Sequence, residues 1–130
     1  MEKYLLEVLK ANALAQMANA RCDRSKLRVG AAVMDNCDNI YTGANLEVFW
    51  QKCYHAEECA ILNAVGHDAK PLVAVCVAAE RELFTPCGGC MDLIMEFGSK
   101  DCLVMHLNPK TRKTTIFTAG ELMPHYPTRK

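Results

Sequence analysis

Apolar residues recur along the chain with two different spacings, which predict that helices and strands alternate. Residues 2 to about 20 place apolar side chains at intervals of three and four, as in a helix with one buried side. Short apolar runs over 28–34 and 40–46 surround a polar turn at 35–39 and predict two antiparallel strands. The continuous apolar run over 72–79 is typical of a central strand covered on both faces.

The remaining segments alternate in the same way. Residues 56–65 predict a helix that is apolar nearly all round and therefore buried, with Gly66 as its C-terminal cap. A second helix is expected over about 87–97, and further strands are expected over 102–107 and 114–117.

Single residues refine this pattern. Gly30 and Gly43 interrupt two predicted strands and indicate either a bulge or the close approach of another backbone. Thr118 and Glu121 have the spacing of a capping box, which predicts a short final helix. The expected order is α-β-β-α-β-α-β-β-α, an α/β fold with a mixed sheet and helices packed on its faces, in a single domain over 1–130.

Composition excludes several classes of protein. Of the 130 residues, 51% are apolar, which argues against disorder, and no apolar run is long enough to span a bilayer. The N-terminus opens an amphipathic pattern rather than a signal peptide. Lysine plus arginine and aspartate plus glutamate balance at 15 each, whereas nucleic-acid-binding proteins usually carry excess positive charge. We therefore expect no membrane and no nucleic-acid partner.

Eight cysteines in a small secreted protein would suggest a disulfide framework. Here the sequence opens without an export signal, and Cys87 and Cys90 have the spacing of metal ligands. Cys59 and Cys76 lie in apolar runs, where a thiol behaves as a small hydrophobic group. We therefore expect a reducing, cytoplasmic location, with the other cysteines as structural thiols and Cys53 as the one further candidate ligand.

The chemically distinctive stretches are His-Ala-Glu at 55–57 and Pro-Cys-Gly-Gly-Cys at 86–90. Zinc accepts imidazole nitrogen and thiolate sulfur in a tetrahedral site, and a catalytic zinc leaves the fourth position for water. His55, Cys87 and Cys90 supply three such ligands. The two cysteines share one face of a predicted helix, whose N-terminal end favours thiolate over thiol. The pattern predicts one open zinc site.

Glu57 lies beside these ligands without being needed as one. The pair H-x-E and P-C-x-x-C is typical of the zinc-dependent nucleobase deaminases. In such a site zinc lowers the pKa of its water to about 7. Glu57 is then expected to move the water's proton to the ring nitrogen under attack and on to departing ammonia. Proton transfer of this kind contributes about 100- to 10,000-fold in rate.

Further motifs in the same order make the chain resemble the cytidine deaminase family from about Lys26 to Pro124. They are Lys26 to Ala32, Gly43 to Glu47, and Glu121 to Pro124, which looks like that family's Glu-Leu-Leu-Pro. The resemblance implies a three-layer cytidine-deaminase-like fold, a mixed five-stranded sheet with helices on both faces. It also implies an aminohydrolase that converts cytidine or deoxycytidine to the uridine counterpart, as a homotetramer whose sites neighbouring subunits complete.

The same resemblance assigns roles around the zinc site. Asn45 and Glu47 are expected to hydrogen-bond the sugar hydroxyls of a pyrimidine nucleoside. The Ala56 backbone N–H and Glu57 are expected to bind the carbonyl and N3 edge of the base. The Thr85 carbonyl is expected to face the exocyclic amine.

Three departures from the family bear on the choice of substrate. Glu58 stands where members with three cysteine ligands commonly have arginine, and Leu27 replaces a phenylalanine that packs on the base. The ending at 125–130 lacks the usual Phe-Gly-Pro and looks closer to blasticidin S deaminases. A deaminase of such a modified cytosine nucleoside is therefore the nearest alternative. A deaminase of bases within nucleic acid and a non-catalytic module with a zinc closed by four ligands are the others.

Several aromatic and imidazole side chains have plainer interpretations. His106 lies in an apolar strand and is expected to be packed, and His67 is expected at a helix end, where the helix dipole favours it. His125 lies on the tail that is expected to close the pocket, so a substrate contact is the alternative there. Phe49 and Trp50 precede the zinc motif and are read as interface or core residues, with base stacking as the alternative.

Overall fold

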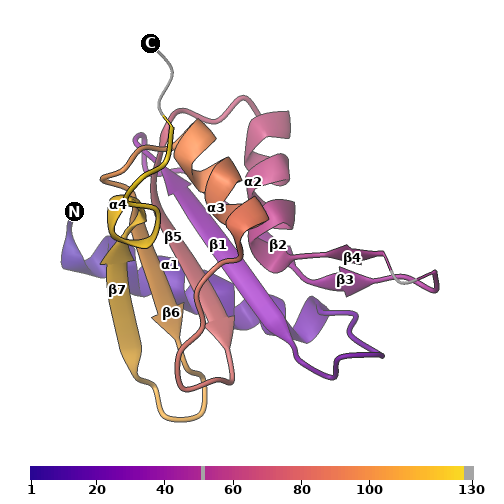
Figure 1. Ribbon diagram of the computed structural model, residues 1–130. Coiled ribbons are helices and arrows are strands. Elements are labelled where there is room, and N and C mark those ends of the chain that lie inside the picture. Colours follow the sequence, from indigo (N-terminus) through magenta and orange to yellow (C-terminus); the bar gives the residue numbers. More distant parts are fainter. Residues whose placement is uncertain (51, 128–130) are drawn as a thin grey trace.

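The computed structural model describes residues 1–50 and 52–127 (Figure 1). Over these residues the helices are α1 (Lys3–Gln16), α2 (Ala56–Gly66), α3 (Gly88–Phe97) and α4 (Ala119–Leu122), with a 3-10 turn, η1 (Met17–Asn19), after α1. The strands are β1 (Val29–Asp35), β2 (Ile40–Ala44), β3 (Leu46–Glu47), β4 (Cys53–Tyr54), β5 (Leu72–Ala79), β6 (Leu103–Leu107) and β7 (Thr114–Thr118).

Five of the strands form one mixed sheet in the order β2-β1-β5-β6-β7. The pair β5–β6 is parallel, and the other three neighbouring pairs are antiparallel. The central position of β5 confirms the prediction from its continuous apolar run. The short strands β3 and β4 form a separate antiparallel hairpin that projects beside the sheet (Figure 1). Among the described helices, none combines the length and apolar character that crossing a membrane requires.

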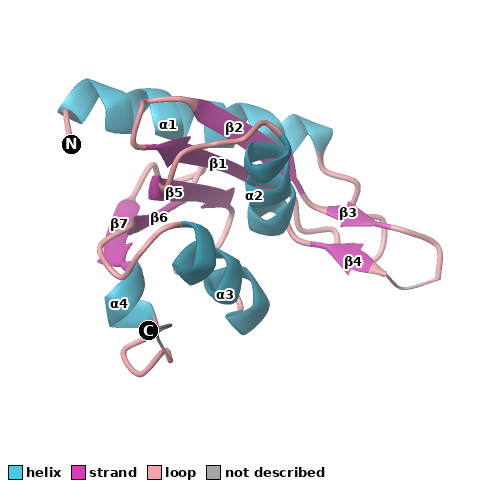
Figure 2. Ribbon diagram, turned by 90° about the horizontal axis from the view of Figure 1, so that it is seen from above, coloured by secondary structure: helices cyan, strands magenta, loops and turns pink. Residues whose placement is uncertain are grey.

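Each face of the sheet has its own hydrophobic core because side chains alternate along a strand. Ala74 and Cys76 of β5 belong to the core under α1, together with Leu9 and Ala13 of that helix. Val75, Val77 and Ala79 belong to the opposite core, to which α2, α3 and α4 contribute. Figure 2 shows α1 on one side of the sheet and these three helices on the other. The predicted three-layer arrangement, with helices on both faces, is confirmed.

Two glycines set how closely the layers approach. A Cβ on Gly30 would lie 2.1 Å from the Ala13 carbonyl oxygen of α1. A Cβ on Gly43 would lie 2.5 Å from the Ala60 backbone nitrogen of α2. Of the two meanings predicted for these glycines, close approach of another backbone is therefore the correct one, since no side chain fits at either position.

Three expectations about element boundaries and burial were wrong. The return strand ends at Ala44 rather than at 46; Asn45 interrupts it, and Leu46 and Glu47 form β3. Gly66 is the last helical residue, His67 is the cap, and the left-handed residue beyond it is Asp68, with φ of 55°. The helix α2 is not buried all round, because Leu62 is 53% exposed.

Candidate metal and substrate site

The three candidate ligands lie at the starts of two helices that pack on the same face of the sheet. His55 is the N-cap residue of α2, and Cys87 is the N-cap residue of α3. Cys90 follows in the first turn of α3, so that the two sulfurs share one side of the helix. Figures 1 and 2 show α2 and α3 side by side. The prediction that both motifs begin helices is confirmed.

The ligand atoms are close enough together to hold one ion. His55 Nδ1 lies 3.3 Å from Cys87 Sγ and 3.5 Å from Cys90 Sγ. All three ligand atoms lie within 4.8 Å of one another. In a tetrahedral zinc site, with bonds of about 2.0–2.1 Å to nitrogen and 2.3 Å to sulfur, such atoms lie about 3.5 Å apart. The residues present therefore fit a zinc ion.

A fourth protein ligand is absent from this cluster. Among the described residues, His55, Cys87 and Cys90 form the one group of histidine, cysteine and acidic side chains that could hold a metal ion. Cys53, the further candidate ligand, lies outside it. A structural zinc is closed by four protein ligands, whereas a catalytic one has three. The donor set therefore fits an open site.

Two buried titratable groups lie at the site: Glu57 beside the cluster and Cys90 within it. Burial raises the pKa of the Glu57 carboxyl, whose side chain is 2% exposed. Burial and the neighbouring Glu57 and Cys87 raise the pKa of the Cys90 thiol. A bound cation acts in the opposite direction, because it stabilises the thiolate.

A pocket of about 350 Å³ opens beside the ligands. This volume lies within the range of about 300–1,000 Å³ that is typical of small-molecule sites. Eight of the nine predicted site residues line it, and the ninth, Cys90, is buried in the cluster. The eight are Leu27, Asn45, Glu47, His55, Ala56, Glu57, Thr85 and Cys87.

Asn45 and Glu47 connect the pocket wall to the neighbouring loop. The Asn45 side chain accepts a hydrogen bond from Val29 N (3.0 Å) and donates one to the Leu27 carbonyl oxygen (2.8 Å). Glu47 Oε1 accepts hydrogen bonds from the backbone N–H groups of Arg24 (2.9 Å) and Ser25 (3.1 Å). The hydrogen bonds from Ser25 are the main reason that the pKa of Glu47 is lowered. Both side chains therefore hold the 24–29 segment in place as well as facing the pocket.

The sequence prediction missed Ser25, Val29 and Phe84, which line the pocket, and named Cys53, which also lines it, only as a candidate ligand. Phe84 and Thr85 precede Cys87 closely in the chain, so their place beside the ligands follows from connectivity alone. Ser25 lies beside Glu47, because its backbone N–H donates a hydrogen bond to Glu47 Oε1.

Three side chains for which a substrate contact was the alternative prediction do not line the pocket. Phe49 and Trp50 are 84% and 86% exposed, so neither belongs to the core. Their rings pack edge-to-face, 5.0 Å apart, and are not part of the pocket lining. His125 is exposed and does not line the pocket either. The next residue, Tyr126, hydrogen-bonds Asp92 of α3, and residues 128–130 of the tail lie outside the described chain.

The other two histidines lie as predicted. His67 is at the end of α2, where its Nδ1 lies 2.8 Å from the Asn63 carbonyl oxygen. His106 is packed inside the fold, with 2% of its surface exposed.

A family profile described as "Cytidine and deoxycytidylate deaminase zinc-binding region" matches residues 4–106. The segment from Cys87 to Cys90 and the His-Ala-Glu motif at 55–57 both lie within that match. Zinc is therefore the metal for which the site is built.

Individual relatives carry a consistent description. The Dictyostelium discoideum protein named "Probable cytidine deaminase" is 31% identical over 99 residues, which cover 74% of this chain and 67% of that protein. A Photorhabdus laumondii cytidine deaminase is 37% identical over 95 residues, which cover 71% of this chain but 30% of the longer protein. The chain thus spans less than a third of the length of that second relative.

The fold has a close counterpart among solved structures. A crystal structure of cytidine deaminase from Burkholderia pseudomallei superposes with a TM-score of 0.83 and 26% identity. The match covers 96% of this chain and 98% of the other. The similarity therefore extends over β7 and α4, beyond the segment that the family profile matches.

Proposed function

Because this chain belongs to the cytidine and deoxycytidylate deaminase family, we propose that it hydrolyses cytidine or deoxycytidine to the corresponding uridine and ammonia. The observation that carries the proposal is a buried acid, Glu57, beside three metal ligands in a pocket of nucleoside size. A binding module with a structural zinc has no need for such a pocket.

We assign the zinc to His55, Cys87 and Cys90 and the proton transfers to Glu57. When bound, zinc supplies Lewis-acid activation of a water molecule near neutral pH. Glu57 would accept one proton from the attacking water and give it to N3 as the C–O bond to the pyrimidine C4 forms. It would then take the proton of the new C4 hydroxyl and give it to the exocyclic amine, so that the C4 carbonyl forms as the C–N bond breaks and ammonia leaves. Its raised pKa suits a group that must both accept and donate a proton.

The remaining contacts are proposed from where the side chains lie. Glu47 uses Oε1 for the loop, so Oε2 is the oxygen that we assign to a sugar hydroxyl. Asn45 has one N–H left after its bond to Leu27, and we assign that donor to the sugar. The Ala56 backbone N–H and the Thr85 carbonyl, both at the pocket, bind the edge of the base, and Leu27 contacts its face.

The direct test is deamination of cytidine by the zinc-loaded protein, followed by the cytosine-to-uracil absorbance change and by ammonia release. Glu57→Gln should keep stoichiometric zinc and lose about 100- to 10,000-fold in kcat, because it removes the proton carrier alone. Glu7→Gln on the exposed surface of α1 is the matched control and should turn over normally. Full activity of Glu57→Gln would rule out the proposed mechanism.

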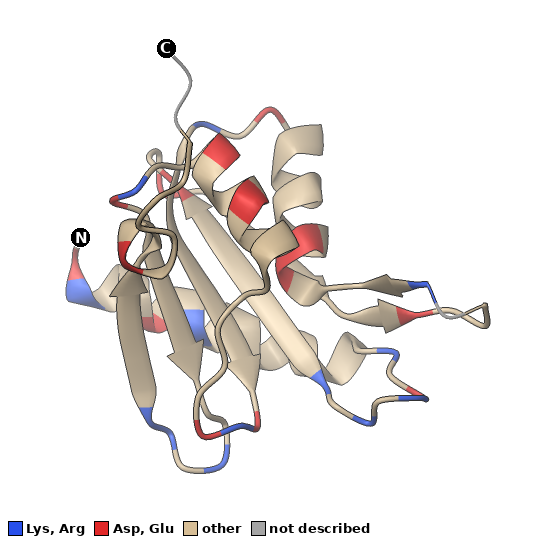
Figure 3. Cartoon of the chain, viewed as in Figure 1, with Lys and Arg blue, Asp and Glu red and all other residues tan. Residues whose placement is uncertain are grey.

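The same assay separates the alternatives. Blasticidin S deamination faster than cytidine deamination would assign the chain to the modified-nucleoside branch. For a base within nucleic acid, the flanking phosphates must also be held. Figure 3 shows acidic residues on α2 and α3, and Lys and Arg on the segment before β1 and on the β3–β4 hairpin, so charges of both signs surround the site. A salt-sensitive affinity for single-stranded RNA would argue for that substrate instead.

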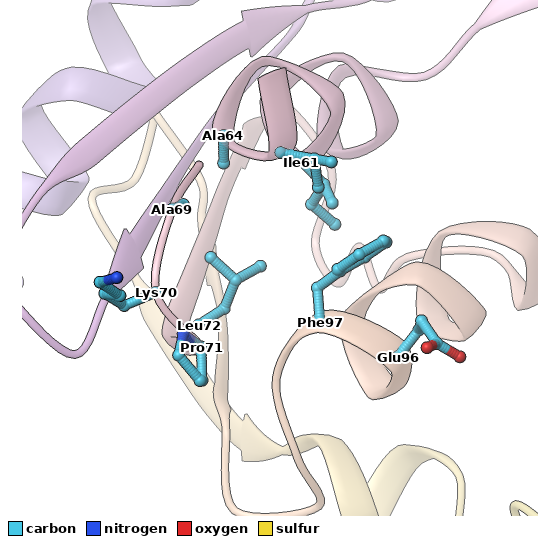
Figure 4. A pocket seen from close by; sticks show the side chains of 9 residues that line it. Ile61, Ala64, Ala69, Lys70, Pro71, Leu72, Glu96 and Phe97 are labelled. Atoms are coloured by element: carbon cyan, nitrogen blue, oxygen red, sulfur yellow. The ribbon is translucent and has the colours of Figure 1, made fainter. Parts of the chain in front are cut away.

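We also propose that the protein is a cytoplasmic homo-oligomer, with a tetramer as the expected state. All eight cysteines are free thiols, which suits a reducing compartment. Leu62 and Val65 of α2 are 53% and 42% exposed. Val65 also lines a pocket between α2 and α3, and Figure 4 shows Ile61, Leu72 and Phe97 around it. Exposed apolar surface on a helix of this kind favours contact with a second copy.

A further inference from the structure

One wall of the pocket depends on a buried histidine that has no part in the proposed chemistry. The segment 80–86 connects the central strand β5 to α3 and has no helix or strand of its own. It nevertheless carries Phe84 and Thr85, both of which line the pocket. A loop that forms a binding surface must be held by bonds from the rigid part of the fold.

His106 of β6 provides one of these bonds and makes a second to the last residue of β5, from which the loop starts. Its Nδ1 lies 3.2 Å from the backbone N–H of Phe84, and its Nε2 lies 2.9 Å from the carbonyl oxygen of Ala79. The rings of Phe84 and His106 also pack together, with centroids 6.2 Å apart. The imidazole thus bridges the end of β5 and the residue that enters the pocket.

The strand register explains why His106 faces this loop. His106 pairs with Val77 in the parallel β5–β6 ladder, and paired residues point to the same face of a sheet. Val77 belongs to the core on the side of α2 and α3. The flanking residues Met105 and Leu107 point the other way, into the core under α1.

A second buried polar side chain holds the start of the same loop. Asn108, which is 9% exposed, donates from Nδ2 to the Arg81 carbonyl oxygen at 2.9 Å. Its Oδ1 accepts from the backbone N–H groups of Lys110 and Thr111, so the amide orientation is fixed. Asn108 and His106 therefore hold the loop at Arg81 and Phe84, and His106 also contacts Ala79 at the end of β5.

The two bonds of His106 also determine its tautomer. The Phe84 N–H is a donor, so Nδ1 must accept and carries no proton. The Ala79 oxygen is an acceptor, so Nε2 carries the proton. Only a neutral ring protonated on Nε2 satisfies both partners at once.

We propose that His106 is a positioning residue for the nucleoside pocket, holding Phe84 and Thr85 against the substrate through its Nε2–H tautomer. The inference rests on the proposed function for its choice of substrate. It predicts that losing the Nδ1 acceptor weakens nucleoside binding without removing zinc, because the ligands themselves are held by α2 and α3.

A pair of amide variants tests which ring nitrogen matters. His106→Asn can place its oxygen near the position of Nδ1, so it keeps the acceptor for Phe84. His106→Gln can place its NH2 near the position of Nε2, so it keeps only the donor to Ala79. We expect His106→Gln to raise KM about tenfold at unchanged kcat and zinc content, the factor that one buried hydrogen bond contributes. His106→Asn should restore most of that loss.

His67→Asn, at the exposed end of α2, is the control and should leave KM unchanged. An unchanged KM in His106→Gln would overturn the proposal. So would an equal loss of zinc, kcat and folding stability in both His106 variants, because a purely structural role predicts that result.

The wild-type protein offers a readout that needs neither a variant nor a substrate. Nitrogen NMR of the imidazole should identify a neutral His106 protonated on Nε2, with a coupling from the Phe84 amide to Nδ1. The opposite tautomer would overturn the inference even in an active enzyme. A wild-type protein that deaminates no nucleoside but shows this signature would refute the proposed function and leave the loop contact in place.

Discussion

Asp35 is a buried carboxylate whose role is structural: it accepts hydrogen bonds from the β1–β2 turn. It lies at the end of β1 and is 0% exposed. Its Oδ1 accepts from the backbone N–H groups of Cys37 and Asn39, both at 2.9 Å. Its Oδ2 accepts from the Asn39 side chain (3.2 Å) and from Lys70 N (3.1 Å). One side chain therefore links the β1–β2 turn to the segment that leads into β5.

Asp35→Asn should destabilise the fold. It puts an NH2 group where backbone N–H donors require an oxygen, so at least one buried donor loses its partner. We expect the free energy of unfolding to fall by about 1–3 kcal/mol, measured by urea denaturation. Asp38→Asn on the same turn is the control, because Asp38 is exposed and has φ of 66°, which asparagine tolerates. Equal stability of Asp35→Asn and wild type would contradict this account.

The same bonds give the fold a defined pH dependence. Burial alone would raise the pKa of Asp35, but hydrogen bonds from Asn39, Cys37 and Lys70 outweigh it and hold the pKa below the ordinary 3.8. Since the folded-state pKa is the lower one, the contribution is complete above about pH 4 and is lost as pH falls through the folded-state value. Wild type should therefore lose more stability than Asp35→Asn on acidification below pH 4.

At the scale of elements, the first turn of α2 is the critical one because it carries both a ligand and the proposed acid. The His55 N–H donates to Glu58 Oε1 at 3.0 Å, which fixes the backbone of the ligand residue at the helix start. Glu58 stands at the position where the family resemblance leads us to expect arginine in members with three cysteine ligands. Its hydrogen bond to the His55 N–H gives this glutamate a structural role. The acidic side chain also suits the positive end of the helix dipole.

Glu58→Ala should loosen the helix start and with it the zinc. We expect a loss of about 0.5–2 kcal/mol in stability, and a fall in zinc affinity of about 10- to 100-fold, as for other groups that orient ligands. Zinc competition with a chromophoric chelator measures the second effect. Glu58→Gln should bind zinc nearly as wild type, because glutamine fills the same place in a capping box. Identical zinc affinities for the alanine variant and wild type would show that Glu58 does not orient His55.

The main helices and strands could be predicted because the pattern of apolar residues in each extends over several residues. The heptad-like spacing of α1 and the apolar run of β5 each extend over several residues, so their periods are readable. The hairpin β3–β4 was missed because each of its strands has two residues, too few to show any period. The end of α2 was misplaced because the left-handed turn falls on Asp68, whereas glycine is the usual residue there.

At the scale of the whole molecule, the site is assembled from three distant segments on one face of the sheet. The metal ligands were predictable because they lie in two local motifs with fixed spacing. Phe84 and His106 were not recognised as parts of the pocket and its support, because their place depends on strand register and loop path. The single-domain organisation over 1–130 stays a prediction, and so do the individual roles of the site residues.

The exposed apolar side of α2 is the surface through which we expect copies of the chain to contact one another. The double variant Leu62→Glu, Val65→Glu should shift the mass in solution toward the monomer, since it places charge on an apolar interface. Light scattering coupled to size exclusion measures this. Val8→Glu, on the helix of the opposite face, is 43% exposed in the wild type and serves as the control. A wild-type monomer, or a double variant of unchanged mass, would refute the proposed assembly.

The tight packing of α2 on Gly43 should make this position intolerant of substitution in a mutational scan. Its Cα hydrogens face the Ala60 nitrogen and the Ala56 carbonyl oxygen of α2, with no room for a methyl group. Any larger residue must lift the helix that begins at His55, and so move one ligand away from the two sulfurs. A library scored on deaminase activity would therefore rank Gly43 with the active-site positions, although Gly43 does not line the pocket.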